Sequence, residues 1–163
     1  MEELAVASAS DMRALGRRLA GRLRPGDLVV LNGPLGAGKT TLVQGIGEGL
    51  NVRGPITSPT FVIARVHPPL GAPPRPGPAL VHADAYRLGG AAEVDDLDLD
   101  ADLDTAVTVV EWGGGLVEGL TDDRLEVTIS PPAAGGADET RVVRVQGVGA
   151  RWAPAGSSPG PAR

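Results

Sequence analysis

The segment from Gly33 to Thr40 carries the residues best suited to chemistry in this chain. It reads Gly-Pro-Leu-Gly-Ala-Gly-Lys-Thr and fits the P-loop pattern G-x-x-x-x-G-K-[ST]. Glycines let backbone N–H groups converge on phosphates, and a following helix presents its positive N-terminus to the same anion. In this pattern Lys39 reaches the β- and γ-phosphates, and the Thr40 hydroxyl supplies an oxygen to Mg²⁺. We therefore expect nucleotide binding by Gly33, Leu35, Gly36, Ala37, Gly38, Lys39, Thr40 and Thr41.

Lys39 is the only lysine among the 15 basic residues of the chain. Lysine is a compact point charge on a slim stem, whereas arginine is a bulky planar fork. A lysine retained in an arginine-rich composition therefore indicates a role that arginine does not fill. Ras-like GTPases read guanine with an N-K-x-D motif, which would need a second lysine, and no D-x-x-G segment follows Asp84. The expected nucleotide is ATP.

Two carboxylates stand where apolar segments end. Asp84 follows the candidate strand 79–83, and Glu111 follows the candidate strand 106–110. The carboxyl ends of parallel strands face the ligand crevice of an open α/β sheet. Both side chains are therefore candidates to hold Mg²⁺, and the sequence leaves open which of them touches the metal directly. With Lys39 they form the predicted catalytic set.

Three further residues are weaker candidates. Thr60 is the last residue of the segment Thr-Ser-Pro-Thr. It could sense the γ-phosphate as a switch residue does, or it could simply begin a strand after a proline turn. Trp112 could shield the site or be a core aromatic. His82 is expected to be a packed, hydrogen-bonded residue within its strand rather than a catalytic one.

The pattern of apolar residues predicts one α/β domain over residues 1–148, with a P-loop NTPase fold. We expect a mostly parallel central sheet flanked by helices, with an antiparallel edge pair near the C-terminus. Residues 149–163 are expected to form a disordered tail. Helices are expected at residues 10–23, with Ser10 as the N-cap, and at residues 39–50. Strands are expected at residues 27–31, within 54–66, and at 79–83, 106–110, 125–130 and 140–146. The Pro-rich stretch 67–78 is expected to be a surface loop.

Composition excludes several classes of protein. The 163 residues carry a net charge of −5, which argues against a general basic face for nucleic acid. The chain has no cysteine, so disulfides, Cys-ligated zinc and a cysteine nucleophile are excluded. No apolar run reaches membrane-spanning length, and the N-terminus lacks the features of a signal peptide. We expect a cytoplasmic protein without membrane contact.

With these pieces placed, the chain resembles the TsaE (YjeE) family of bacterial P-loop ATPases over roughly residues 4–147. The motifs LNGPLGAGKTTLVQGIGEGL, TSPTF, HADAYRL and VVEW occur in this order. The resemblance implies an ATPase that supports formation of N6-threonylcarbamoyladenosine (t6A) in tRNA, with the TsaB–TsaD heterodimer as partner and tRNA reached only through that complex. It further implies that Lys39 binds phosphate and that Thr40 and Glu111 hold Mg²⁺.

Roles for the remaining motif residues also follow from the resemblance. Asp84 would assist hydrolysis or order the water shell of the metal, Thr60 would belong to a switch-like loop, and Trp112 would lie beside the site. Two other functions remain open from the sequence. One is a small-molecule or nucleotide kinase, although no arginine lies between 88 and 105 to form a cationic lid. The other is a nucleotide-sensing docking module with little turnover.

Overall fold

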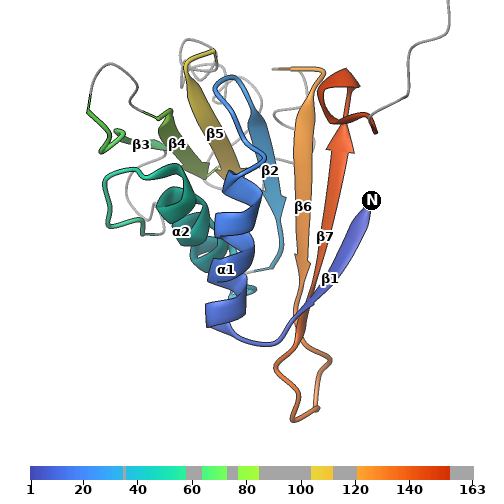
Figure 1. Cartoon of the computed structure of the whole chain (residues 1–163). Coiled ribbons are helices and arrows are strands. Elements are labelled where there is room, and N and C mark those ends of the chain that lie inside the picture. The colour runs from blue at the N-terminus through green and yellow to red at the C-terminus, as the bar shows by residue number, and fades with distance from the viewer. Residues whose placement is uncertain (35, 58–63, 73–76, 85–103, 112–120, 155–163) are drawn as a thin grey trace, which may run out of the picture.

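A seven-stranded sheet organises the molecule, with two helices on one of its faces (Figure 1). The computed structural model describes residues 1–34, 36–57, 64–72, 77–84, 104–111 and 121–154. The strand order is β1-β7-β6-β2-β5-β4-β3. The strands are β1 (Glu2–Val6), β2 (Leu28–Asn32), β3 (Ala64–His67), β4 (Ala79–Asp84), β5 (Ala106–Glu111), β6 (Arg124–Ser130) and β7 (Arg141–Val148).

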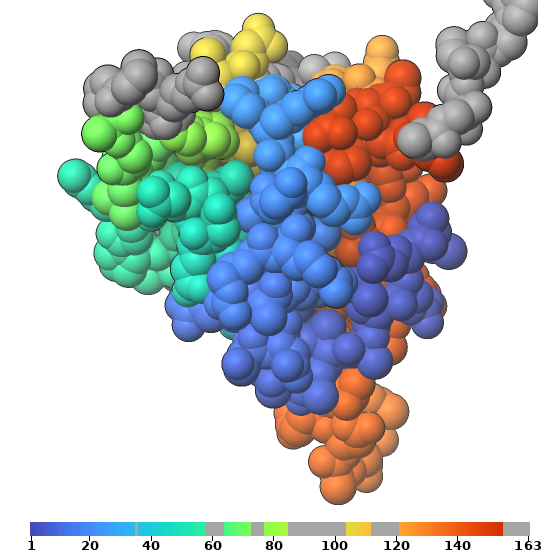
Figure 2. All heavy atoms as spheres, in the orientation of Figure 1, coloured from blue at the N-terminus to red at the C-terminus, as the bar shows by residue number. Residues whose placement is uncertain are grey.

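The sheet is mixed, so the expectation of a mostly parallel sheet is wrong. Strands β6, β2, β5 and β4 are parallel neighbours, whereas the pairs β1–β7, β6–β7 and β3–β4 are antiparallel. The antiparallel pair near the C-terminus exists as the β6–β7 hairpin, but it is not at the edge. Strand β1 lies outside β7, and β6 pairs with β2. The carboxyl ends of β6, β2, β5 and β4 consequently lie at the same end of the sheet (Figure 1). At that end the β6–β7 hairpin projects from the rest of the molecule, as the space-filling view shows (Figure 2).

Helix α1 (Ala9–Ala20) and helix α2 (Lys39–Leu50) pack side by side over the sheet (Figure 1). The bounds of α2 agree with the prediction, and those of α1 are shifted towards the N-terminus. Its cap is Ser8 rather than Ser10, because the Ser8 hydroxyl oxygen accepts the Asp11 backbone N–H at 3.1 Å. The apolar face of α1 enters the same core as β2, β6 and β7.

Glycines let α1 and α2 approach each other closely. A Cβ atom added to Gly16 would collide with the backbone carbonyl of Leu42 and lie 2.8 Å from the Gly45 Cα atom. A Cβ atom on Gly45 would in turn collide with the Arg13 carbonyl oxygen. Such glycines cost helix propensity, up to about 1 kcal/mol each relative to alanine. They are retained because two backbones occupy the space that their side chains would need.

We predict that Gly16→Ala destabilises the protein although alanine is the better helix former. The added methyl group meets backbone atoms that no rotamer change can move away, so we expect a loss of about 1–3 kcal/mol in the free energy of unfolding. Gly21→Ala is the matched control, since its added Cβ would lie 3.4 Å from the Arg18 carbonyl oxygen at φ −64°. Urea unfolding measures both variants. Equal stability of the two variants would contradict this account of the helix contact.

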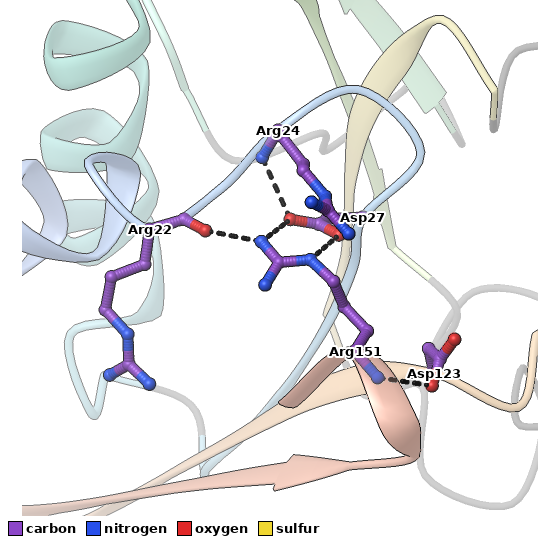
Figure 3. A network of polar contacts seen from close by, with 5 residues as sticks. All are labelled: Arg22, Arg24, Asp27, Asp123 and Arg151. Atoms are coloured by element: carbon purple, nitrogen blue, oxygen red, sulfur yellow. Dashed lines mark hydrogen bonds and ion pairs between the residues drawn. The ribbon is translucent and has the colours of Figure 1, made fainter. Parts of the chain in front are cut away.

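The segment after β7 is folded onto the domain as far as the structure describes it, which corrects the expectation of a disordered tail from residue 149. Residues Ala150–Trp152 form a short 3₁₀ helix. The Arg151 guanidinium donates to both carboxylate oxygens of Asp27, at 3.2 and 3.0 Å, and to the Arg22 carbonyl oxygen at 2.8 Å (Figure 3). It also stacks 4.2 Å from the ring centroid of Trp152. Asp27 is buried just before β2, so the contact ties the C-terminal segment to the central strand.

Removing this ion pair is expected to destabilise the domain. Arg151→Ala leaves the buried Asp27 carboxylate without its bidentate partner, and uncompensated buried charge is costly. Because the Arg151 side chain is 21% exposed, solvent screens part of that cost, and we expect a loss of about 2–3 kcal/mol. Arg144→Ala removes an exposed pair with Glu3 and should cost at most about 1 kcal/mol. Thermal unfolding of the two variants compares them; similar midpoints would contradict this reading.

Two other segments differ from expectation. Strand β1 was not predicted, although it closes one edge of the sheet against β7. The Pro-rich stretch 67–78 was expected to be a surface loop throughout, but His67 ends β3. The residues that follow are held in place, because the backbone N–H of Leu70 donates to the Asn51 carbonyl oxygen at 3.0 Å. In the part of the chain that the structure describes, no helix has the length and apolar character needed to cross a membrane.

Candidate functional site

The glycine-rich segment joins the end of β2 to the start of α2. Gly36 and Gly38 have φ angles of 77° and 108°, a region that residues with a Cβ atom rarely adopt, which explains the glycines at these two positions. Gly38 is also the N-cap of α2, and no side chain caps the helix there. The first N–H groups of the helix are thus not satisfied by a capping side chain, which suits anion binding.

Lys39 folds back over this loop. Its ammonium group donates to the Gly33 carbonyl oxygen at 2.6 Å, and the residue is only 7% exposed. Burial lowers the pKa of Lys39 below its ordinary value, while the nearby carboxylates of Glu111 and Asp84 act in the opposite direction. The ammonium group of Lys39 is thus held close to the loop and to two carboxylates.

Glu111 and Asp84 lie next to each other at the carboxyl ends of β5 and β4. They are Cα partners in the parallel pairing of these strands, and both side chains are buried. Strand β5 pairs directly with β2, with Glu111 opposite Leu31, whereas β4 is one strand further away. Neighbouring strands are about 4.8 Å apart, so Glu111 stands closer than Asp84 to the loop that follows β2.

His82 contacts one of these acids. Its Nε2 atom lies 3.0 Å from Glu111 Oε1, and the His82 side chain is completely buried. The expectation of a packed, hydrogen-bonded histidine is confirmed, but its partner was not foreseen. Within the described ranges the other ring nitrogen, Nδ1, has no hydrogen-bond partner. A ring that carries a proton on Nε2 would donate to Glu111 and fix the orientation of that carboxylate.

The structure brings together the core of the predicted site and leaves some members undescribed. Thr40 stands in the first turn of α2, and Thr41 lines a pocket on the side of the loop that faces α1. Leu35, Thr60 and Trp112 lie outside the described residues. Among the residues that are described, no three or more His, Asp or Glu side chains form a ready metal cage.

Comparison with known proteins identifies the family. A family model described as "Threonylcarbamoyl adenosine biosynthesis protein TsaE" matches residues 6–140, which is most of the chain. The chain belongs to the TsaE family. The loop, Lys39 and the two strand-end carboxylates all lie inside the matched range.

Relatives in this family include proteins named tRNA threonylcarbamoyladenosine biosynthesis protein TsaE. The Streptomyces coelicolor protein is 63% identical over 145 residues, covering 88% of this chain and 95% of its own length. The Mycobacterium tuberculosis protein is 54% identical, and the match covers 73% of this chain and 73% of that protein. The Bacillus subtilis protein is 36% identical, and the match covers 87% of this chain and 83% of that protein. The crystal structure of B. subtilis YdiB superposes with a TM-score of 0.70 at 27% identity, covering 93% of this TsaE-family chain and 88% of YdiB.

Proposed function

We propose that the protein is a Mg²⁺-dependent ATPase with a P-loop NTPase fold that supports t6A formation by the TsaB–TsaD complex. The observation that carries the proposal is the position of Lys39, buried between the Gly33 carbonyl oxygen and the charges of Glu111 and Asp84. Family membership supports the pathway, because the family description names threonylcarbamoyl adenosine biosynthesis. The absence of a second lysine favours ATP over GTP.

The chemistry of the available donors fits Mg²⁺. This ion prefers oxygen ligands and is usually held by one or two protein groups together with waters and substrate phosphates, rather than by a complete protein cage. Thr40 offers a hydroxyl oxygen at the helix start, and Glu111 offers a buried carboxylate whose Oε1 atom already meets His82. We assign the metal to Thr40 and Glu111, because Asp84 stands one strand further from the loop.

Each residue then has a defined task in hydrolysis. The Lys39 ammonium would leave the Gly33 carbonyl oxygen for the β- and γ-phosphates and stabilise the charge that develops on them. The backbone N–H groups of the loop and of the α2 N-terminus would hold the phosphates in place. When bound, Mg²⁺ supplies further charge neutralisation at these oxygens. Asp84 would assist hydrolysis or order the water shell of the metal.

The proposed partners follow from the family rather than from a surface of this chain. We assign the protein to the cytoplasm, acting with the TsaB–TsaD heterodimer and meeting tRNA only through that complex, with no membrane contact. A net charge of −5 agrees with the absence of an independent tRNA-binding role.

Phosphate release assays on the full chain test this function. We expect slow, Mg²⁺-dependent ATP hydrolysis by the protein alone, faster hydrolysis with TsaB–TsaD from the same organism, and multiple turnovers of t6A formation only when all three proteins and ATP are present. Transfer of the γ-phosphate to an added small molecule would support a kinase instead. Binding of ATP with normal t6A turnover but no hydrolysis would support a docking module.

His82 is predicted to act as a positioning residue through Glu111. His82→Ala removes the 3.0 Å contact and frees the carboxylate to rotate, so we expect the hydrolysis rate to fall about tenfold while ATP affinity changes less than about threefold. His82→Gln places an amide N–H near the same position and should restore part of the rate. Steady-state kinetics separates kcat from KM. An alanine variant that loses ATP affinity and rate together would point to a general packing role for His82.

A further inference from the structure

The chain contains two histidines, and the fold brings them together at one edge of the described sheet. His67 ends β3, and His82 lies within β4, the antiparallel neighbour of β3 (Figure 1). His67 is the Cα partner of Leu80, which stands two residues before His82. Because opposed residues share a face, as do residues two apart on one strand, both histidines lie on the same face of the sheet. Leu80 packs in the core under α1 and α2, so this is the face that the helices cover.

Each imidazole ring has one nitrogen with a hydrogen-bond partner and one without. His67 Nδ1 lies 3.0 Å from the Arg53 carbonyl oxygen, and His82 Nε2 lies 3.0 Å from Glu111 Oε1. A carbonyl oxygen and an ionised carboxylate only accept, so these two nitrogens carry the protons. The remaining nitrogens, His67 Nε2 and His82 Nδ1, are buried and have no hydrogen-bond partner in the described part of the chain. In its neutral form, each ring therefore presents a buried lone pair.

The surroundings of His67 favour that neutral form. Burial lowers the pKa of His67, against the raising effect of the hydrogen bond to the Arg53 carbonyl oxygen. Positive charge on His82 or Arg65 lowers this pKa further. His67 is 6% exposed and His82 is completely buried, so neither lone pair is open to bulk water. A buried polar atom without a partner is costly, and a ligand that accepts the lone pairs would remove that cost.

We propose that His67 and His82 bind a divalent transition-metal ion of the zinc class through His67 Nε2 and His82 Nδ1. Neutral imidazole is a preferred ligand of Zn²⁺, whereas Mg²⁺ prefers oxygen ligands, so this site differs in chemistry from that of Thr40 and Glu111. A metal-binding histidine almost always donates its other ring N–H to a backbone carbonyl or a carboxylate, and the two rings do one each. The coordination positions that the rings do not fill are left to water.

Carboxylates on the same face favour a cation at this position. Asp84 stands two residues after His82 on β4, and Glu111 is the Cα partner of Asp84 on β5. A metal on His82 Nδ1 leaves the Nε2 proton directed at Glu111, so the metal and that carboxylate are linked through one ring. Zn²⁺ binding here requires neither ATP nor hydrolysis and is therefore independent of the proposed function.

Isothermal titration of the full chain with Zn²⁺ in excess Mg²⁺ tests the site. We expect one Zn²⁺ per chain in the wild type. His67→Gln keeps an amide N–H for the Arg53 carbonyl oxygen but removes the imidazole ligand. Since loss of a second-shell partner alone costs about 10–100-fold in metal affinity, His67→Gln should weaken Zn²⁺ binding at least about tenfold. Arg65→Gln, at an exposed position of the same strand, is the matched control and should bind Zn²⁺ at least as tightly as the wild type.

Glu111→Gln distinguishes this site from the proposed Mg²⁺ site. Its amide oxygen still accepts from His82, so it should weaken Zn²⁺ binding less than His67→Gln does. Loss of Zn²⁺ binding in Glu111→Gln with wild-type binding in His67→Gln would place the ion at the Mg²⁺ site and overturn the histidine site.

Nitrogen NMR of the imidazole rings provides a test that needs no variant, because the chain has no third histidine. Zn²⁺ should shift the signals of His67 Nε2 and His82 Nδ1 together and leave both protonated nitrogens protonated. Zn²⁺ that shifts neither ring, or only one of them, would overturn the site even if His67→Gln does not fold.

Discussion

Lys39→Met is expected to lower ATP affinity and the rate of ATP hydrolysis by at least about a hundredfold each. Methionine preserves the slim apolar stem but removes the cation that faces the phosphates, and the loss of one preorganised charged donor is worth about 10²–10³ in rate. Because Lys39 is 7% exposed and its burial already lowers its pKa, removing the charge should not unfold the protein. Titration calorimetry measures the affinity, and phosphate release measures the rate.

The companion variant Lys39→Arg tests why lysine is retained. It keeps the positive charge but places a broad planar fork in the buried space beside the Gly33 carbonyl oxygen. We expect its hydrolysis rate to be nearly as low as that of Lys39→Met, with an unfolding midpoint close to that of the wild type. Wild-type hydrolysis by either folded variant would show that the loop is not the phosphate site.

Glu111→Gln is expected to separate ATP binding from hydrolysis. Glutamine has the same shape, and its carbonyl oxygen can still accept from His82, so the fold and the local hydrogen bond are preserved. The negative charge that would hold Mg²⁺ is lost, and we expect the hydrolysis rate to fall at least about a hundredfold. ATP affinity measured without Mg²⁺ should remain within a few-fold of wild type, or improve slightly, because an anion near the phosphates has been removed.

Asp84→Asn serves as the matched control for Glu111→Gln. Both substitutions remove one buried carboxylate charge from adjacent strand ends. If Glu111 ligates the metal, its variant should need much more Mg²⁺ for half-maximal activity, while the Asp84 variant should mainly lose kcat. Magnesium titrations of hydrolysis compare the two, and the reverse pattern would exchange their roles.

The sequence predicted the local elements that position the site. Helix α2 was predicted with its observed bounds because the loop motif marks its start and Leu42, Val43, Ile46 and Leu50 mark its buried face. Strands β4 and β5 were recognisable as continuous apolar runs that are buried along almost their whole length. Since both end in a carboxylate, the grouping of Asp84, Glu111 and Lys39 followed once the strands were taken as parallel neighbours.

Pairings between distant segments were not predictable in the same way. Strand β1 is short and carries two glutamates, so only Leu4 and Val6 mark its buried face. It forms because β7 offers a free edge and these two side chains pack on the core. The position of β7 between β1 and β6 is likewise not indicated by any local sequence pattern. Composition predicted a disordered tail from residue 149. In the structure, however, Arg151 donates to the buried carboxylate of Asp27, which is distant in the sequence, and this contact orders the start of that segment.

One feature of the site was also not predicted from the sequence. The contact of His82 with Glu111 depends on the register of β4 against β5, which only the assembled sheet defines. The spacing of two residues between His82 and Asp84, which places both side chains on one face of a strand, was the available signal for the histidine.

The most direct test of the account is a crystal structure of the protein with a non-hydrolysable ATP analogue and Mg²⁺. We predict that the β- and γ-phosphates lie against the loop from Gly33 to Thr41, with Lys39 released from the Gly33 carbonyl oxygen to contact them. Mg²⁺ should be bound by the Thr40 hydroxyl and the Glu111 carboxylate. A nucleotide bound elsewhere, or one bound at the loop with no metal between Thr40 and Glu111, would contradict the account.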